Sequence, residues 1–201
     1  MTEQNPEPIQ PGVSQPIYTR TEFENLREES AAEMANDEDL QRDALDVLAR
    51  ADRYRWIHQT NWFGEPILQL PQDVLAIQEI LFETRPEFIV EVGVAWGGSL
   101  LLYSTLMELL GGNRIIGIDV YIPEDLKARI ASFQKLSERI TWINGSSIDP
   151  RTYEQVKNIT GDSKDVMVVL DSNHEHEHVL QELNIYSHLV GPGPGCPVAL
   201  W

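Results

Sequence analysis

The chain contains 201 residues, of which 42% are hydrophobic, and its formal net charge is −17 at pH 7. That length fits one domain with a sizeable core and an appended segment. The negative charge repels nucleic-acid phosphates and anionic lipid headgroups, so nucleic-acid partners and membrane-surface docking are not expected, and its main role is solubility. No apolar run approaches the ~18 residues of a membrane-spanning helix, so no membrane span is expected.

The first residues differ in composition from the rest of the chain. Residues 1–18 contain four prolines and few apolar residues, which predicts a flexible tail. They lack the basic and apolar regions of a signal peptide. The single cysteine, Cys196, excludes an internal disulfide and is compatible with a reducing compartment, so the expected location is the cytoplasm.

Residues 19–70 form a predicted helical segment that leads into the main domain. They are acidic with sparse apolar positions, which predicts one or two solvent-facing helices. Near the end of this segment stand Trp56, Trp62 and Phe63. These aromatic side chains either form an apolar wall over an acceptor molecule or pack in the core.

Residues 71–190 alternate between helical patterns and short apolar strands. Strands are predicted at 87–94, 114–120, 139–145 and 165–171, and helices at 71–84, 98–113, 123–136, 146–159 and 176–190. This alternation predicts βαβ units and a parallel sheet, and the continuous apolar strands indicate that helices cover both faces. The expected fold class is therefore α/β, a Rossmann-like parallel sheet that binds its ligand at the carboxyl ends of the strands.

Three of the predicted strand ends carry groups suited to a nucleoside. Gly93 follows the first strand and lets a ligand approach the backbone closely. Asp119 lies 26 residues further along, where a carboxylate can accept both hydroxyls of a ribose. After the third strand come Ser146 and Ser147, beside a helix start that Asp149 is expected to cap. Together these loops predict a cavity for a nucleoside-like molecule.

The glycine run G-V-A-W-G-G leaves two cofactors to consider. It fits the NAD pattern G-x-G-x-x-G only with alanine as the second glycine, and Trp96 would stand where backbone must meet phosphate. Glu91, two residues before Gly93, suits a cationic ammonium group better than a diphosphate. S-adenosylmethionine carries such an amine with a ribose and an adenine, so it is the preferred interpretation.

The sequence H-E-H-E-H, residues 174–178, matches the zinc-protease signature H-E-x-x-H. That signature needs both histidines on one face of a helix, but His174 falls before the predicted helix start, and His188 is the only later histidine. We therefore expect no zinc site. His176 and His178 are expected on the solvated first turn of a helix, where the neighbouring glutamates are favoured.

Asp171 and His174 belong to the end of the fourth strand, where the reacting atoms of such a fold are expected. An aspartate there can hold a divalent ion, and a nearby imidazole can take a proton from an acceptor hydroxyl. The alternative for Asp171 is the N-cap of the following helix.

Four separated motifs of the chain resemble the cephalosporin hydroxylase / rhamnosyl O-methyltransferase family. They are, in order, W-F-G-E-P-I-L-Q-L-P-Q-D, E-V-G-V-A-W-G-G-S, N-G-S-S-I-D and L-D-S-N-H-E-H-E-H-V-L-Q-E-L. The resemblance covers about residues 54–190. It implies a class I methyltransferase that uses S-adenosylmethionine to methylate a hydroxyl of a sugar or another natural-product small molecule.

The resemblance also implies a role for individual residues. Glu91, Gly93 and Ser99 would line the methionine end of the cofactor, Asp119 would hold the ribose, and Ser147 would sit near the adenine. Asp171 would be a magnesium ligand, and His174 falls where related O-methyltransferases have a catalytic base. Gln69 and Asp73, in the first of the four motifs, would border the cofactor cavity.

The chain departs from the family pattern at its end. The family continues with a hydrophobic strand whose acidic residues complete the metal site, whereas residues 191–201 read G-P-G-P-G-C-P-V-A-L-W. We therefore expect an irregular tail, missing metal ligands and an exposed edge on the fourth strand that favours self-association into a homo-oligomer. The ending leaves the alternative of a truncated protein that binds the cofactor without turnover, and the glycine run leaves the alternative of an NAD-dependent oxidoreductase.

Overall fold

The computed structural model describes residues 18–191 and 198–200. The chain divides into two compact units, one ending at Arg53 and the other beginning at Tyr54. The boundary lies earlier than the predicted one near residue 70, because residues 54–70 belong with the sheet. Nearly all of the predicted flexible tail, as well as Cys196, lies outside the described residues.

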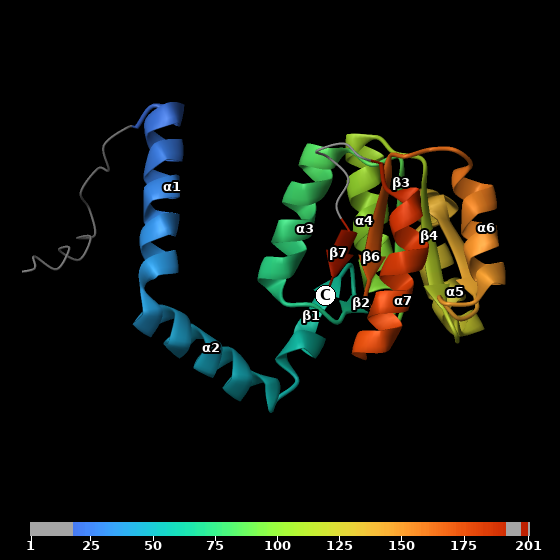
Figure 1. Cartoon of the computed structure of the whole chain (residues 1–201), viewed down its shortest axis with the longest axis horizontal. Coiled ribbons are helices and arrows are strands. Elements are labelled where there is room, and N and C mark those ends of the chain that lie inside the picture. The colour runs from blue at the N-terminus through green and yellow to red at the C-terminus, as the bar shows by residue number, and fades with distance from the viewer. Residues whose placement is uncertain (1–17, 192–197, 201) are drawn as a thin grey trace, which may run out of the picture. The chain divides into compact units, whose positions relative to one another are not determined.

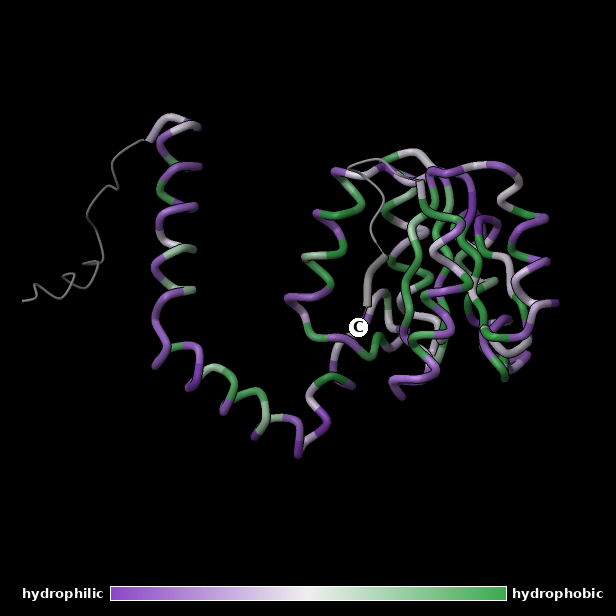
Figure 2. The backbone as a smooth tube through the Cα atoms, viewed as in Figure 1, coloured by the Kyte–Doolittle hydropathy of each residue, from purple (hydrophilic) through white to green (hydrophobic). Residues whose placement is uncertain are grey.

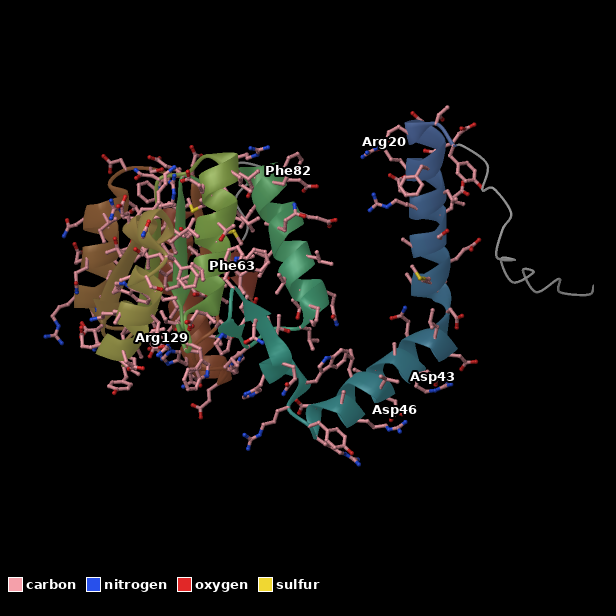
Figure 3. All side chains as sticks on the ribbon, turned by 180° about the vertical axis from the view of Figure 1, so that it is seen from behind. Arg20, Asp43, Asp46, Phe63, Phe82 and Arg129 are labelled. Atoms are coloured by element: carbon pink, nitrogen blue, oxygen red, sulfur yellow. The ribbon has the colours of Figure 1, made fainter. Side chains whose placement is uncertain are left out.

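The first unit contains two consecutive helices, α1 (Arg20–Asn36) and α2 (Glu38–Asp52), and none of their residues is buried. The two predicted solvent-facing helices are therefore confirmed. Helix α1 begins at a capping box, in which Thr19 N donates to Glu22 Oε2 at 2.8 Å and Glu22 N donates to Thr19 Oγ1. In Figure 2 both helices are drawn largely in purple, with shorter green stretches for their sparse apolar residues, and Figure 3 labels three of their charged side chains, Arg20, Asp43 and Asp46.

The second unit opens with a short antiparallel ribbon that the sequence did not predict. Helix η1 (Trp56–Gln59) leads into strands β1 (Thr60–Trp62) and β2 (Glu65–Ile67). Trp62 packs against the core and donates from Nε1 to Thr105 Oγ1 at 3.1 Å. Phe63 is instead 63% exposed and lies against Phe133, with ring centroids 6.3 Å apart. The core role is therefore confirmed for Trp62, while Phe63 faces solvent and none of the three aromatic residues Trp56, Trp62 and Phe63 lines the cavity described below.

Five parallel strands form the central sheet in the order β5-β4-β3-β6-β7 (Figure 1). Val92 pairs with both Ile118 and Leu170, so the carboxyl ends of β3, β4 and β6 lie level with one another. The sheet therefore brings the loops after these strands to one edge. The strands are β3 (Phe88–Val92), β4 (Arg114–Asp119), β5 (Ile140–Asn144), β6 (Val166–Leu170) and β7 (Val198–Leu200).

Strand β7 corrects the expectation for the end of the chain. Its three residues pair in parallel with β6, with Val168 opposite Val198 and Leu170 opposite Leu200. Backbone hydrogen bonding thus covers part of the edge that was expected to stay open. The prolines and glycines that argued against a strand all precede residue 198, so they do not interrupt it.

Helices cover both faces of the sheet, as the continuous apolar strands predicted. One core holds Ile89 beneath helices α3 to α5, and the opposite core holds its neighbour Val90 beneath α6 and α7. Successive strand residues point to opposite faces, so a strand apolar at every position fills both cores. The helices are α3 (Pro71–Thr84), α4 (Gly98–Leu110), α5 (Glu124–Ala131), α6 (Pro150–Thr160) and α7 (His176–Tyr186), with short 3₁₀ helices η2 (Gln134–Arg139) and η3 (Ser187–Leu189).

Local signals set several of these helix ends. Pro71 and Pro150 occupy the first turns of α3 and α6, where the missing N–H costs nothing. Asp149 caps α6 as predicted, because its side chain accepts a hydrogen bond from Arg151 N at 2.9 Å. Arg85 ends α3 in a left-handed conformation directly before Pro86. Among the described residues, no helix is both long and apolar enough to cross a membrane.

Candidate functional site

A cavity of about 520 Å³ lies at the carboxyl ends of β3, β4, β5 and β6. Its size falls within the roughly 300–1,000 Å³ of small-molecule sites. The site that the sequence predicted from its strand ends is therefore present as one cavity. Seven of the predicted site residues line it, namely Gln69, Gly93, Ser99, Asp119, Ser147, Asp171 and His174.

Gly93 lines the cavity at the end of β3. Its φ is +95°, and a Cβ at this position would lie 2.0 Å from the backbone oxygen of Asp171. Gly93 N donates to Ile118 O at 2.8 Å, and Asp171 N donates to Val92 O at 2.8 Å. Only glycine satisfies both the left-handed backbone and this close approach, so Gly93 fastens three strand ends together beneath the cavity.

Asp119 ends β4 and organises the two neighbouring loops. Its Oδ2 accepts a hydrogen bond from Val94 N at 2.9 Å, and its Oδ1 accepts one from Tyr121 N at 3.1 Å. A carboxylate has about four acceptor positions, so Asp119 can hold these loops and still accept from a ligand hydroxyl.

Glu91 does not line the cavity, contrary to the expectation for it. Its side chain is 0% exposed within β3 and accepts hydrogen bonds from Ser99 Oγ at 2.8 Å and Tyr103 OH at 3.0 Å. Burial, with smaller contributions from the charges of Asp171 and Asp119, raises the pKa of Glu91 to about 8. A glutamate in the middle of a strand covered on both faces is buried, so Glu91 reaches the cavity only through Ser99.

Gln69 lines the cavity with an amide that has no hydrogen-bond partner of normal geometry. The residue is 4% exposed, and both its Nε2 and its Oε1 are buried without such a partner among the described residues. The amide lies near Asp171 and Tyr103: burial raises the pKa of both groups, and the Gln69 amide partly opposes that rise. A buried amide is costly to leave unpaired, which marks Gln69 as a binding group for a ligand. Asp73, on the first turn of α3, is not part of the lining.

Asp171 and His174 stand together at the end of β6. Burial raises the pKa of Asp171 to about 6, and the nearby His174 and Gln69 oppose that rise. His174 Nε2 lies 3.6 Å from Asp171 Oδ1, and the His174 side chain is 66% exposed. The N-cap of α7 is Glu175, so the alternative of Asp171 as the cap is wrong.

The zinc-protease interpretation fails as the sequence predicted. Helix α7 begins at His176, so His174 lies outside it and cannot share a helix face with His178. His176 faces solvent, with a side chain 83% exposed. Within residues 18–191 and 198–200, no group of three or more His, Cys, Asp or Glu side chains could hold a metal ion.

His178 departs from its predicted solvated position. Its side chain is only 20% exposed, lines the cavity, and lies with Nε2 3.0 Å from Oε1 of the fully buried Glu182. Ser147 Oγ donates to the same oxygen at 2.5 Å. The i, i+4 spacing of His178 and Glu182 was the available signal, since residues at that spacing share one helix face.

The described residues do not supply a complete set of ligands for magnesium. Asp171 offers one carboxylate at the end of β6, and no group of three or more His, Cys, Asp or Glu stands among the described residues to hold a metal ion. Mg²⁺ prefers six oxygen ligands in near-octahedral geometry, commonly with one or two carboxylates and several waters. No reaction step is therefore assigned to a metal here.

The parallel sheet, the glycine at the end of β3 and the acid at the end of β4 define a Rossmann-like protein of the class I methyltransferase type. Comparisons with known proteins identify the family. A family model described as Rhamnosyl O-methyltransferase/CmcI matches residues 54–199, so the chain belongs to the rhamnosyl O-methyltransferase/CmcI family.

Several known proteins are similar to this chain. A rhamnosyl O-methyltransferase of Mycobacterium leprae is 28% identical over 137 residues, covering 67% of this chain and 57% of the relative. One from Mycobacterium tuberculosis is 26% identical over 138 residues, covering 67% and 54%. The chain thus spans little more than half the length of the curated relatives that it matches.

Two solved structures of CmcI proteins share the fold. An apo structure has a TM-score of 0.52 and 26% identity, covering 68% of this chain and 55% of the other. A complex described as holding magnesium and S-adenosylmethionine has a TM-score of 0.50 and 25% identity, with the same two coverages.

Proposed function

We propose that this chain binds S-adenosylmethionine and acts as an O-methyltransferase on a hydroxyl of a sugar or natural-product small molecule. The observation that carries the proposal is the single cavity where Gly93, Asp119 and the unpaired Gln69 meet. Membership of the rhamnosyl O-methyltransferase/CmcI family supports it.

The residues of the cavity fit the parts of this molecule. Asp119 can accept the ribose hydroxyls, and Gly93 lines the cavity beside it. The Gln69 amide offers both donors and an acceptor, which suits the amino-acid end. Ser99 links that end to the buried Glu91. Carboxylates at Asp119 and Asp171, which both line the cavity, favour a positively charged ligand over a diphosphate.

In this mechanism the chain contributes alignment and proton transfer. When bound, S-adenosylmethionine would supply an electrophilic methyl group on its sulfonium and would leave as the thioether once the acceptor oxygen has taken that methyl group. Gln69, Gly93 and Asp119 fix the direction of that methyl group, since positioning supplies much of the acceleration in a displacement. The His174 imidazole accepts the proton of the acceptor hydroxyl, and the Asp171 carboxylate, 3.6 Å from Nε2, stabilises the resulting imidazolium.

The acceptor is proposed from two lines of support. The curated relatives are named for a rhamnosyl group. The outer rim of the cavity carries the exposed apolar side chains of Trp96 and Val120. An aromatic face of this kind suits the apolar face of a deoxysugar. The NAD interpretation is disfavoured by the family match.

Isothermal titration of the 201-residue protein with S-adenosylmethionine and S-adenosylhomocysteine tests the binding step. Both should bind, and Asp119→Asn should weaken binding about tenfold or more because a charged acceptor is lost. Asp162→Asn, at a fully exposed surface carboxylate, is the matched control and should leave binding unchanged. If the wild-type protein binds neither compound, the proposed function is wrong.

A radiolabelled methyl-transfer assay with a rhamnoside tests turnover separately. Binding without transfer would favour the alternative of a cofactor-binding protein without activity. If the wild-type protein incorporates label and His174→Ala does not, the result supports His174 as the base. If His174→Ala incorporates as much label as the wild type, His174 is not the base.

A further inference from the structure

A fully buried carboxylate joins three elements at one wall of the cavity. Glu182, on α7, is 0% exposed, and its Oε1 accepts from Ser147 Oγ at 2.5 Å and from Ser172 Oγ at 2.6 Å. His178 Nε2 lies 3.0 Å from the same oxygen. Ser147 follows β5 and Ser172 follows β6, so the carboxylate ties both strand ends to the helix.

These contacts fix which ring nitrogen of His178 carries a proton. The single hydroxyl protons of Ser147 and Ser172 are both donated to Glu182. Nε2, 3.2 Å from Ser147 Oγ as well, therefore faces only acceptor oxygens. A lone pair on Nε2 would be repelled there, so Nε2 carries the proton and donates it. In the neutral ring Nδ1 is then an acceptor, and no described residue hydrogen-bonds to it.

The cluster is not a catalytic triad. In a Ser-His-carboxylate triad the serine and the carboxylate bond opposite nitrogens of the imidazole. Here Ser147 and Glu182 both lie beside Nε2, and the serine donates directly to the carboxylate. The cluster therefore holds the imidazole in one tautomer, without activating a nucleophile.

We propose that His178 Nδ1 is a hydrogen-bond acceptor that selects a nucleobase edge bearing an amino group, with Glu182 as the positioning residue that sets its tautomer. The inference rests on the proposed function, in which Asp119 holds the ribose. A nucleoside anchored there, with its amino-acid end at Gln69, directs its base toward the wall formed by Ser147 and His178. Both of these residues line the cavity.

Adenine and hypoxanthine differ at the group that Nδ1 would meet. Adenine presents an amino group that can donate to Nδ1, whereas hypoxanthine presents a carbonyl oxygen that the Nδ1 lone pair repels. A site built to pair with a donor rejects an analogue that lacks it, because its own polar group is left unpaired. We expect S-adenosylhomocysteine to bind about tenfold or more tightly than S-inosylhomocysteine.

Titration calorimetry with these two compounds tests the role of Nδ1. It compares two variants of His178 whose side chains differ in length. In His178→Asn the carboxamide oxygen can take the place of Nδ1, so the preference for S-adenosylhomocysteine should persist. In His178→Gln the longer side chain reaches the position of Nε2 and keeps the contact with Glu182, but it loses the acceptor. The preference should then fall to about threefold or less.

His176 provides the matched control on the same helix, since it is solvent-facing. His176→Asn and His176→Gln should leave the preference unchanged, and thermal melts establish that each variant is folded. Equal wild-type affinity for both compounds would overturn the inference and leave the proposed function standing. A preference for S-adenosylhomocysteine that persists in His178→Gln would also overturn the inference and leave the proposed function standing. The same holds if His178→Asn and His178→Gln lose the preference to the same extent. Binding of neither compound would remove the proposed function and this inference together.

Discussion

The two units of this chain show two ways in which helices are stabilised. Helices α1 and α2 bury no residue, and local interactions such as the capping box at Thr19 support them. In the second unit, α4 buries eight residues against the sheet, including Leu100, Leu101 and Tyr103. Caps contribute about 1 kcal/mol each, whereas a buried leucine contributes about 2–5 kcal/mol. The stability of the sheet unit is therefore a tertiary property, and that of the helical unit is local.

The largest expected effect comes from Gly93→Ala, which should break the sheet unit. The new Cβ would overlap the backbone oxygen of Asp171, and the φ of +95° strains any side chain. Together these costs reach about 4 kcal/mol or more, enough to unfold a domain of ordinary stability. Guanidinium denaturation measures the loss.

Gly161→Ala is the control for this change. Gly161 also has a positive φ, of +59°, but a Cβ there would meet nothing within 4 Å. Its cost should be about 1–3 kcal/mol, because a φ of +59° with a ψ of −132° strains any side chain. Equal losses in the two variants would contradict the role assigned to the close approach at Gly93.

Leu100→Ala and Leu45→Ala compare the two units directly. Leu100 is 0% exposed in α4, whereas Leu45 is 68% exposed in α2. The first change should lower the free energy of unfolding by about 3 kcal/mol, and the second by less than about 0.5 kcal/mol. Chemical denaturation of both variants measures this difference. A loss of more than about 1 kcal/mol at Leu45 would mean that α2 buries this side chain in solution.

Glu91→Gln should change how stability depends on pH. The pKa of Glu91 is about 8 in the folded protein against an ordinary value of 4.5, because the group is buried. Between these values the folded protein holds a proton that the unfolded chain releases. Wild-type stability therefore falls as pH rises from about 4.5 to 8, by at most about 1.4 kcal/mol per pH unit from this group.

Denaturation curves across that range, compared between the wild type and Glu91→Gln, isolate the contribution of Glu91. The variant should show a flatter profile, with a residual fall below about pH 6 because the pKa of Asp171 is also raised. Parallel profiles for the two proteins would show that Glu91 is already ionised when the protein is folded.

The smallest expected effect is that of Thr19→Ala. It removes the hydroxyl of the capping box and should destabilise the start of α1 by about 1 kcal/mol. Hydrogen exchange should show faster exchange of amides in the first turn of α1, while the melting temperature of the sheet unit stays the same. A lower melting temperature for that unit would indicate that the two units fold together.

Much of the site could be predicted from the sequence, because the carboxyl ends of parallel strands lie at the same edge of a sheet. The order of apolar strands and helices was enough to place Gly93, Asp119, Ser147 and Asp171 at one edge. The side-chain surroundings could not be derived in this way. Glu91 was expected to face the ligand, yet its position in the middle of a doubly covered strand buries it behind Ser99.

By itself, the sequence determined the local features of this protein: the alternation of elements, the proline and aspartate helix starts, and the glycine that the first loop requires. Periodicity and backbone sterics act over a few residues, so they can be read along the chain. Only the tertiary structure decided the ribbon at residues 60–67, the strand at Val198–Leu200 and the burial of His178 against Glu182. The ribbon and the strand depend on pairing between separate segments of the chain. The burial of His178 depends on which face of α7 packs against the cavity, and tertiary packing determines that face.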